Sequence, residues 1–476
     1  MYRFPGAGRR LAQLVALILV MFIGGLSVSG AHRDSTAFAA TPAAQLIHVD
    51  GVQGTDSATC GVNPGPAACQ TISYALDHRT TAGSTVSVAA GTYYETITLR
   101  PGVAVQGAGA DVTTIDGNGT GPVVTADGAA IGDTVVLSDF TVTGGQATQG
   151  AGITIRDGAA PVIEHTVIRN NTADFGGAMH IDACSPTVRA NTIRDNTATS
   201  NAGGIYVWQG APSISGNTIQ GNSSEWGGGL FINHSAAVVS SNTVSNNSAI
   251  QGGGGLYVFD YATATISSNR IENNQAPGTD SWAGGGGLAI GVDCSPTVIG
   301  NFIRGNTAVY GGGIKINIDS GNPPGTLTAH GNIVCGNSGY QFYNETATAV
   351  DITGNWWGTN TPGAAQLYGP ATYSPAIALT LSANPTTVIV PGASTVQATL
   401  QGGDYTVPNG TILTWSTTLG TLNPPSSATA NGSAQTSLSS AATGTASVAA
   451  TDPCGFTVTA AVNFVIGRAY LPLLAR

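Results

Sequence analysis

Apolar and polar residues alternate along the middle of the chain in short stretches that recur about every 26 residues. Each repeat contains three such stretches, and an alternation with a period of two is typical of β-strands rather than helices. A column of mostly asparagine residues marks the repeat: Asp139, His165, Asn191, Asn217, Asn242, Asn269, Asn301 and Asn332. A fixed period of this size indicates a solenoid, in which each repeat stacks on its neighbours to bury its apolar face.

Four apolar columns predict which side chains point into the solenoid. On the first two strands they consist of Val136, Val162, Val188, Ile214, Val239, Ile266 and Val298, and of Val167, Ile193, Ile219, Val244, Ile271, Ile303 and Val334. On the third strand they consist of Ile153, Met179, Ile205, Leu230, Leu256, Leu288 and Ile314, and of Ile155, Ile181, Val207, Ile232, Val258, Ile290 and Ile316. Residues that alternate with these on the third strand are expected on the outside.

The asparagines and glycines of the repeat have a structural explanation. An asparagine amide can hydrogen-bond the equivalent amide on the next coil, about 4.8 Å away, and glycine adopts backbone angles that a β-carbon would block. The N-x-I-x-x-N pattern, followed by glycines and a strand, resembles the repeats of right-handed parallel β-helix proteins of the pectin-lyase fold. Asn355-Trp356-Trp357-Gly358 resembles the motif that closes the last coil. The resemblance implies an all-β protein with a right-handed three-sheet parallel β-helix over residues 46–372.

A change of composition near Ser374 predicts a second domain over residues 375–467. Short strands rich in Thr, Ser, Ala and Val alternate there with Pro and Gly, a spacing that indicates a β-sandwich. The order of its motifs, such as Thr411–Ser416 and Gly444–Ala450, resembles the invasin/intimin-type immunoglobulin-like domain. Residues 468–476 are expected to form a C-terminal tail.

Residues 1–40 are typical of an export signal. Arg3, Arg9 and Arg10 precede an apolar run, and Ala37-Phe38-Ala39 provides a small-x-small cleavage pattern. A permanent membrane anchor is the alternative, because the run is about 18 residues long. With the signal removed no transmembrane segment is expected, so we predict a secreted protein, free or attached to the cell surface. Only 8% of residues are charged and the net charge is −10, which disfavours nucleic acid as a partner.

Six cysteines can form disulfides outside the cytoplasm. Cys60 and Cys69 lie close together in a loop rich in Gly, Pro and Asn, and they are the favoured pair. Cys184 and Cys294 occupy equivalent turns four coils apart, roughly 19 Å, which is too far for them to pair with each other. The sequence does not decide the disulfide partners of Cys184, Cys294, Cys335 and Cys454.

The outward positions of the third strand carry most of the candidate chemistry. They form two files, Thr154, His180, Tyr206, Phe231, Tyr257, Ala289 and Lys315, and Arg156, Asp182, Trp208, Asn233, Phe259, Gly291 and Asn317. Five aromatic side chains are therefore expected on one exposed face: Tyr206, Trp208, Phe231, Tyr257 and Phe259. Aromatic faces about 4.8 Å apart suit sugar rings, which predicts binding of a polysaccharide or cell-surface glycan, or adhesion through it. An aromatic stack that only protects the sheet is the alternative, and would fit a structural surface protein without a ligand.

A polysaccharide lyase or glycoside hydrolase that acts on an acidic glycan is the enzymatic alternative. Lyases of the pectin-lyase fold need carboxylates that hold Ca²⁺ and a Lys or Arg base, and hydrolases need two placed carboxylates. Asp293 and Asp319 share a register on adjacent coils, with Asp260 on the coil before, and are the candidate Ca²⁺ ligands. An exposed Asp at a turn is more often a turn-former. The candidate catalytic residues are Asp293, Asp319, Lys315, His180 and Asp182.

One repeat is lengthened by residues Ala276 to Trp282. This insertion is predicted to project as a loop, and loops on solenoids often shape binding clefts. Phe175, Trp226 and Tyr310 stand at the same position before the glycines in other repeats. The alternative interpretation is therefore that Trp282 is an ordinary feature of the repeat.

Overall fold

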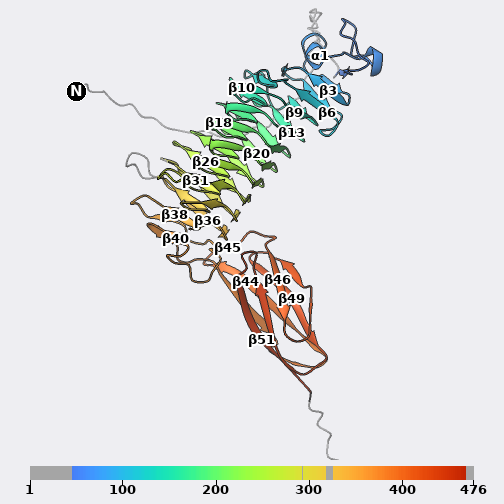
Figure 1. The fold of residues 1–476 in the computed structure, drawn as a ribbon. Coiled ribbons are helices and arrows are strands. Elements are labelled where there is room, and N and C mark those ends of the chain that lie inside the picture. The colour runs from blue at the N-terminus through green and yellow to red at the C-terminus, as the bar shows by residue number, and fades with distance from the viewer. Residues whose placement is uncertain (1–44, 292, 318–324, 468–476) are drawn as a thin grey trace, which may run out of the picture. The chain divides into compact units, whose positions relative to one another are not determined.

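A computed structural model of the protein describes residues 45–291, 293–317 and 325–467, so the predicted signal segment and C-terminal tail lie outside them. Between residues 46 and 372 the chain winds into coils whose strands stack in order of sequence (Figure 1). Sheet A has 13 strands, from β1 (Leu46–Val49) to β41 (Ala371–Thr372), and sheet B has 10, from β3 (Gly91–Tyr94) to β37 (Ile333–Cys335). Neighbouring strands pair in parallel, which confirms the predicted parallel β-helix.

Sheet C is the sheet formed by the predicted third strands. Its 11 strands are β4 (Ile97–Thr98), β7 (Val124–Asp127), β11 (Ile153–Arg156), β15 (Met179–Asp182), β19 (Ile205–Trp208), β23 (Leu230–Asn233), β27 (Leu256–Phe259), β31 (Leu288–Ile290), β35 (Ile314–Ile316), β38 (Phe342–Asn344) and β40 (Leu367–Tyr368). Leu230, Leu256 and Leu288 are register partners on successive strands, and all three are fully buried. The two inward columns of the third strand are therefore confirmed.

A fourth sheet, sheet D, adds to the three that the sequence predicted. Its seven strands are β10 (Gln146–Gln149), β14 (Thr172–Phe175), β18 (Thr197–Asn201), β22 (Ser223–Trp226), β26 (Ser248–Gly252), β30 (Gln275–Ala276) and β34 (Thr307–Ala308). These segments lie between sheets B and C in each coil and are rich in Ala, Thr, Ser and Gln, with few large apolar side chains. They form strands because the same segment of the next coil supplies the hydrogen-bonding partner.

Two files of buried asparagines hold the coils together. The first consists of Asn191, Asn217, Asn242, Asn269, Asn301, Asn332 and Asn355, and the second of Asn171, Asn196, Asn222, Asn247, Asn274, Asn306 and Asn337. Each Nδ2 donates to the Oδ1 of the next asparagine, as from Asn191 to Asn217 at 3.0 Å, and the backbone N–H of the same residue donates to that oxygen at 2.9 Å. The second Nδ2 proton of Asn191 reaches the carbonyl of Ile163 at 2.8 Å. The structural interpretation of the asparagines is thus confirmed.

The predicted register is wrong by one residue in the first two coils of the column. Asp139 and His165 have left-handed backbones, with φ of 67° and 49°, and they precede the ladder position instead of occupying it. The N–H of Thr166 donates to Asn191, so Thr166 holds the ladder position.

The apolar columns of these coils shift in the same way. Leu137 and Ile163 replace Val136 and Val162 in the inward file of Val188, and Ile168 replaces Val167 in the file of Ile193. The error arose because Asp and His resemble Asn as polar markers, although Asp and His here form the left-handed turn.

The first coil is capped by a 3-10 turn (Gly65–Ala67) and by one helix, α1 (Ile72–His78), whose buried residues join the solenoid core. Thr71 caps the helix by accepting from the N–H of Tyr74, and Glu95 accepts from the N–H groups of Ile72 and Ser73 at 2.9 and 2.8 Å. These bonds satisfy donors that a helix N-terminus leaves unpaired. No helix in the described part of the chain is long and apolar enough to cross a membrane.

The C-terminal strands form two sheets around a second apolar core. One contains β42 (Ala378–Asn384), β44 (Gly392–Gly402), β45 (Tyr405–Thr406), β47 (Thr421–Asn423) and β49 (Ser433–Ser440). The other contains β43 (Thr387–Ile389), β46 (Ile412–Thr417), β48 (Ser426–Ala428), β50 (Gly444–Thr451) and β51 (Thr457–Val465). Pairing is antiparallel except between β43 and β51, and the buried residues include Leu400, Leu438, Val448 and Phe464. The arrangement is a β-sandwich.

The last coil and the sandwich share one apolar core. Ile333, Cys335 and Trp356 of the last coils pack into the same buried cluster as the sandwich residues. Cys335 forms a disulfide with Cys454, a pairing that the sequence left open, and the indole N–H of Trp356 donates to Asp452. Cys184 and Cys294 are both free and buried, so the prediction that they do not pair with each other is confirmed.

The asparagine ladder can be tested at Asn274. Its Oδ1 accepts from both the backbone and the side chain of Asn247 at 3.0 Å, so Asn274→Ala leaves two buried donors unpaired. We expect the free energy of unfolding to fall by about 2–4 kcal/mol, measured by urea denaturation. Gln275→Ala, at the exposed neighbouring position, is the matched control and should change it by less than about 0.5 kcal/mol. Equal effects of the two substitutions would contradict the structural importance of the ladder.

Candidate functional site

The predicted exposed face of sheet C is largely covered. Tyr206, Phe231 and Tyr257 are only 6%, 3% and 4% exposed, so the prediction that they form an open platform is wrong. The cause is the glycine turn before each strand of sheet C. Gly253 has φ of 68°, and a β-carbon there would lie 2.7 Å from Cβ of Tyr257. The backbone of the turn therefore presses directly on the outward side chains.

The buried rings also pack against one another instead of presenting parallel faces. The ring centroids of Tyr206 and Phe231 are 5.5 Å apart and tilted, and those of Phe231 and Tyr257 are 5.1 Å apart and edge-on. These are favourable aromatic geometries, but they use the faces that a sugar would need. Trp208 and Phe259, on the second outward file, are half-buried and border this cluster.

Beside the cluster lies a cavity of about 510 Å³, which we call the aromatic cleft. Its lining residues come from sheets C and D and from the inserted loop: Asn201, Trp226, Phe231, Tyr257, Phe259, Trp282 and Asn317. Trp282 is 45% exposed. The Nδ2 of Asn317 donates to the hydroxyl of Tyr257 at 3.1 Å, whereas the buried Oδ1 of Asn317 has no partner among the described residues. The cleft thus combines apolar walls with an amide oxygen that is able to accept a hydrogen bond from a ligand.

A smaller cavity of about 200 Å³, the histidine cavity, lies further along the same sheet. It is lined by Gln149, Phe175, His180, Asp182, Tyr206 and Trp208. His180 is 2% exposed, its ring stacks on Tyr206 at 5.1 Å, and its Nδ1 has no hydrogen-bond partner among the described residues. Burial lowers the pKa of His180 to about 4, and the nearby Asp182 opposes this shift. The imidazole is therefore neutral at pH 7.

Lys315 was predicted to be an exposed base, and this is wrong. Its side chain is fully buried, and its Nζ donates to the carbonyl oxygens of Ser281 and Ala283 and lies 3.2 Å from Glu345. The desolvation that comes with burial lowers the pKa of Lys315, and Glu345 opposes the effect. Both carbonyls flank Trp282, so Lys315 holds the inserted loop at the aromatic cleft.

The predicted Ca²⁺ ligands are only partly described. Asp319 lies outside the described residues. Asp260 lies 3.4 Å from Nδ1 of His234, and Asp293 interacts with the hydroxyl of Tyr261, whose pKa it raises. In the described ranges these aspartates do not belong to any cluster of three metal-binding side chains. Calcium binding therefore stays a prediction.

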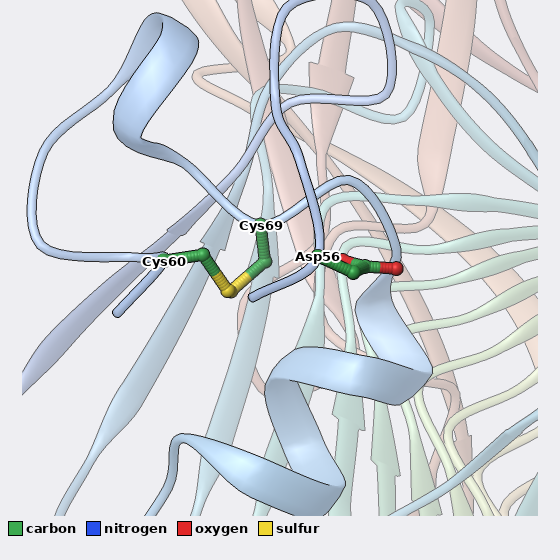
Figure 2. A group of neighbouring side chains, drawn as sticks. All are labelled: Asp56, Cys60 and Cys69. Carbon is green, nitrogen blue, oxygen red and sulfur yellow. A yellow bond between two sulfur atoms is a disulfide. The ribbon is translucent and has the colours of Figure 1, made fainter. Parts of the chain in front are cut away.

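One group of three metal-capable side chains does occur in the part of the chain that the structure describes: Asp56, Cys60 and Cys69 (Figure 2). The two cysteines form a disulfide, the pairing that the sequence favoured, so their sulfur atoms are not thiolates. Asp56 accepts hydrogen bonds from the N–H groups of Gln70 and Thr71 at 2.7 and 3.1 Å. These residues fasten the cap of the first coil and do not fit a metal site.

The sequence missed four lining residues of the aromatic cleft as site residues: Asn201, Trp226, Trp282 and Asn317. The sequence signal for Trp282 was the insertion of residues 276–282. This insertion was predicted to form a loop that shapes a cleft, and Trp282 does line the aromatic cleft. Asn201 and Trp226 are end residues of sheet D strands, which the sequence did not predict. A cleft made by these residues could be found only from the way that sheet D folds beside sheet C.

Comparisons with known proteins give partial similarities. Residues 113–290 match the family model NosD, described as a periplasmic copper-binding protein, and no curated protein is significantly similar. A complex of a 282-residue C-terminal intimin fragment with the intimin-binding domain of its receptor is 30% identical, with a TM-score of 0.17, and the match covers 18% of this chain and 32% of that one. The D0-D1 domain of intimin is 29% identical, with a TM-score of 0.17 and coverage of 18% and 47%. This chain thus matches less than half of either intimin structure. Pectate lyase Pel9A is 14% identical, with a TM-score of 0.39 and coverage of 61% and 80%.

The copper in the NosD description was tested against the described residues. Copper sites in proteins are built from imidazole, thiolate and thioether ligands. The cluster at Asp56 offers none of these, because its cysteines are oxidised, and the histidine cavity contains a single imidazole. Neither of these two places therefore offers the ligand set of a copper site.

Protonation of His180 should destabilise the protein in acid. The folded pKa of about 4 lies below the ordinary value of 6.5, so the unfolded chain binds the proton more readily between these values. Stability is full above about pH 6.5 and falls as the pH drops towards 4, by about 2–3 kcal/mol in total. Denaturation midpoints across this range should show a smaller loss in His180→Phe. His78→Phe, which removes an exposed histidine, is the control. An unchanged pH dependence in His180→Phe would contradict the assignment.

The role of Lys315 predicts a local loosening. Lys315→Met keeps the apolar stem but removes the donors to Ser281 and Ala283. We expect amide hydrogen exchange across residues 276–283 to become about tenfold faster, as the loss of roughly 1.4 kcal/mol of local stability requires. Exchange in the sandwich should not change. If the 276–283 amides keep their protection, Lys315 does not hold this loop.

Proposed function

We propose that this protein binds carbohydrate outside the cytoplasm through the aromatic cleft. The observation that carries the proposal is the composition of the cleft, a cavity of about 510 Å³ lined by five aromatic side chains and by Asn317, whose buried Oδ1 has no hydrogen-bond partner among the described residues. A sugar ring has an apolar face and a rim of hydroxyl groups. The aromatic side chains of the cleft can pack against the apolar face of the sugar, and the amide oxygen of Asn317 can accept a hydrogen bond from one of its hydroxyl groups.

The chemistry of the unpaired groups supports a hydroxyl-bearing ligand. A buried acceptor without a partner costs about 1–3 kcal/mol, which a donor from a ligand would recover. Asn317 Oδ1 is such an acceptor, and Nδ1 of His180 at the histidine cavity likewise has no hydrogen-bond partner among the described residues. Tyr206 of the histidine cavity and Phe231 of the aromatic cleft are in contact, so the two cavities are neighbours along the coil axis.

An extracellular location is supported by the cysteines. Cys60 is bonded to Cys69, and Cys335 to Cys454, and such structural disulfides persist mainly in oxidising compartments. We propose that the protein is secreted or displayed at the cell surface, where the solenoid presents its cleft to a glycan. Adhesion is the role that this placement favours.

Turnover of an acidic glycan has less support than binding. The base proposed for it, Lys315, is buried and paired with Glu345, so it has no access to a substrate proton. We therefore propose recognition without cleavage.

A glycan array probed with the mature chain tests the proposal. Trp282→Ala should weaken binding to the glycans that are retained by about three- to tenfold, because it removes the exposed ring of the cleft. Tyr94→Ala, which removes a 72% exposed tyrosine from sheet B, is the matched control and should bind as the wild type does. Retention of no glycan at all, or equal loss in both variants, would refute the proposal. Reducing or unsaturated ends in a product assay would refute binding without turnover.

A further inference from the structure

A second group of aromatic side chains lies on the outer side of sheet C in the last coils, and we call it the tyrosine cluster: Tyr310, Tyr340, Tyr343 and Tyr368. Tyr343 and Tyr368 stack with ring centroids 4.4 Å apart, and Tyr340 lies 5.7 and 5.3 Å from them. Tyr310 lies 5.7 Å from Tyr343. Tyr368 is 45% exposed, so the cluster reaches the surface.

Tyr343 and Tyr368 of the tyrosine cluster belong to the same outward file as Phe231 and Tyr257 of the aromatic cleft. On successive strands of sheet C, the register partner of Tyr257 is Ala289, followed by Lys315, Tyr343 and Tyr368. The whole file, from Tyr206 on β19 to Tyr368 on β40, therefore spans six steps between coils. At about 4.8 Å a step, this is about 29 Å, which is longer than a mono- or disaccharide.

The tyrosine cluster brings four phenolic hydroxyl groups into one region of the surface of sheet C. Burial, with the nearby Tyr368 and Glu345, raises the pKa of Tyr343 to about 12, so its hydroxyl keeps its proton and can donate. A phenolic hydroxyl can also accept a hydrogen bond. These phenolic groups suit a chain of sugar hydroxyl groups more than they suit an apolar partner.

The charges near the file disfavour an acidic ligand. The described lining of the aromatic cleft and the histidine cavity contains no Lys or Arg, and its acidic residue is Asp182. Lys315 is buried against Glu345. Arg156, on the coil next to Asp182, lies 2.7 Å from Asp127 and 3.7 Å from Asp157 and is thereby neutralised. In the described lining of these two cavities, a polyanion would meet like charge without a free cation to pair with it.

We infer that the ligand is an uncharged linear polysaccharide that lies lengthwise along sheet C and contacts both the aromatic cleft and the tyrosine cluster. This inference rests on the proposed function and names its substrate class. It assigns to Tyr368 and its neighbours a binding role that is separate from the cleft. It also separates this chain from an enzyme or lectin for acidic glycans, which needs cations or bound metal in its groove.

The test compares ligands of different length and charge by calorimetry. Cellohexaose, xylohexaose and laminarihexaose are the neutral probes, each with its disaccharide, and hexagalacturonate and hexaglucosamine are the anionic and cationic probes. We expect a neutral hexasaccharide to bind more tightly than its disaccharide, and the affinity to be the same at low and high salt, because ion pairs are not involved. Tighter binding of either charged probe than of every neutral probe would overturn the inference.

Variants separate the tyrosine cluster from the cleft. Tyr368→Ala should weaken the hexasaccharide by about three- to tenfold and leave the disaccharide unaffected, whereas Trp282→Ala should weaken both. Tyr373→Ala, which removes a 36% exposed tyrosine outside the cluster, is the matched control. Unchanged hexasaccharide binding by Tyr368→Ala would overturn the inference while the proposed function stands. Binding of no probe and no glycan by the wild type would reject both.

Discussion

The structure depends on the pairing of each coil with the next through buried amides. An asparagine in the middle of an apolar core is costly unless all its hydrogen bonds are made. Here each ladder asparagine accepts at Oδ1 and donates at Nδ2 within the stack, as Asn247 does between Asn222 and Asn274. Because the amide contacts lie one coil apart, they set the register of every strand that follows. This register also fixes the positions of the outward side chains of sheet C, and therefore the spacing of the groups that line the two cavities.

Glycine is the second constraint, and it decides what the surface of sheet C can offer. The turns before its strands need left-handed backbone, as at Gly227 and Gly253 with φ of 65° and 68°. Such turns bring sheet D against the outward side chains of sheet C and bury the rings that alternation alone places in solvent. The result is a pair of cavities between the sheets in place of an open aromatic platform. A cavity holds a ligand more selectively than a flat face, because it surrounds more of the ligand surface.

Buried polar groups have contrasting roles along this surface. Lys315 is satisfied by two carbonyl oxygens and Glu345, and its role is to position the loop that carries Trp282. Oδ1 of Asn317 and Nδ1 of His180 have no hydrogen-bond partner in the described part of the chain, and both residues line a cavity. Lys315, whose hydrogen bonds are made within the protein, stabilises the fold. A ligand gains the most binding free energy by pairing with the polar atoms of Asn317 and His180. This contrast disfavours catalysis at Lys315 and favours recognition at the aromatic cleft.

The sequence by itself determined the parallel solenoid, the inward files of sheet C and the structural role of the asparagines, because each of these follows from periodicity within one repeat. It also predicted the sandwich and the bond between Cys60 and Cys69, for which spacing along the chain is sufficient. Only the tertiary structure decided that Tyr206, Phe231 and Tyr257 are covered, that Lys315 is buried and that Cys335 meets Cys454. The burial of these side chains depends on how a polar segment of the coil packs over the neighbouring strand. The disulfide depends on the meeting of two residues that are 119 positions apart in the sequence. The alternation of side chains tells which face of a strand a residue occupies, but it does not tell what else lies on that face.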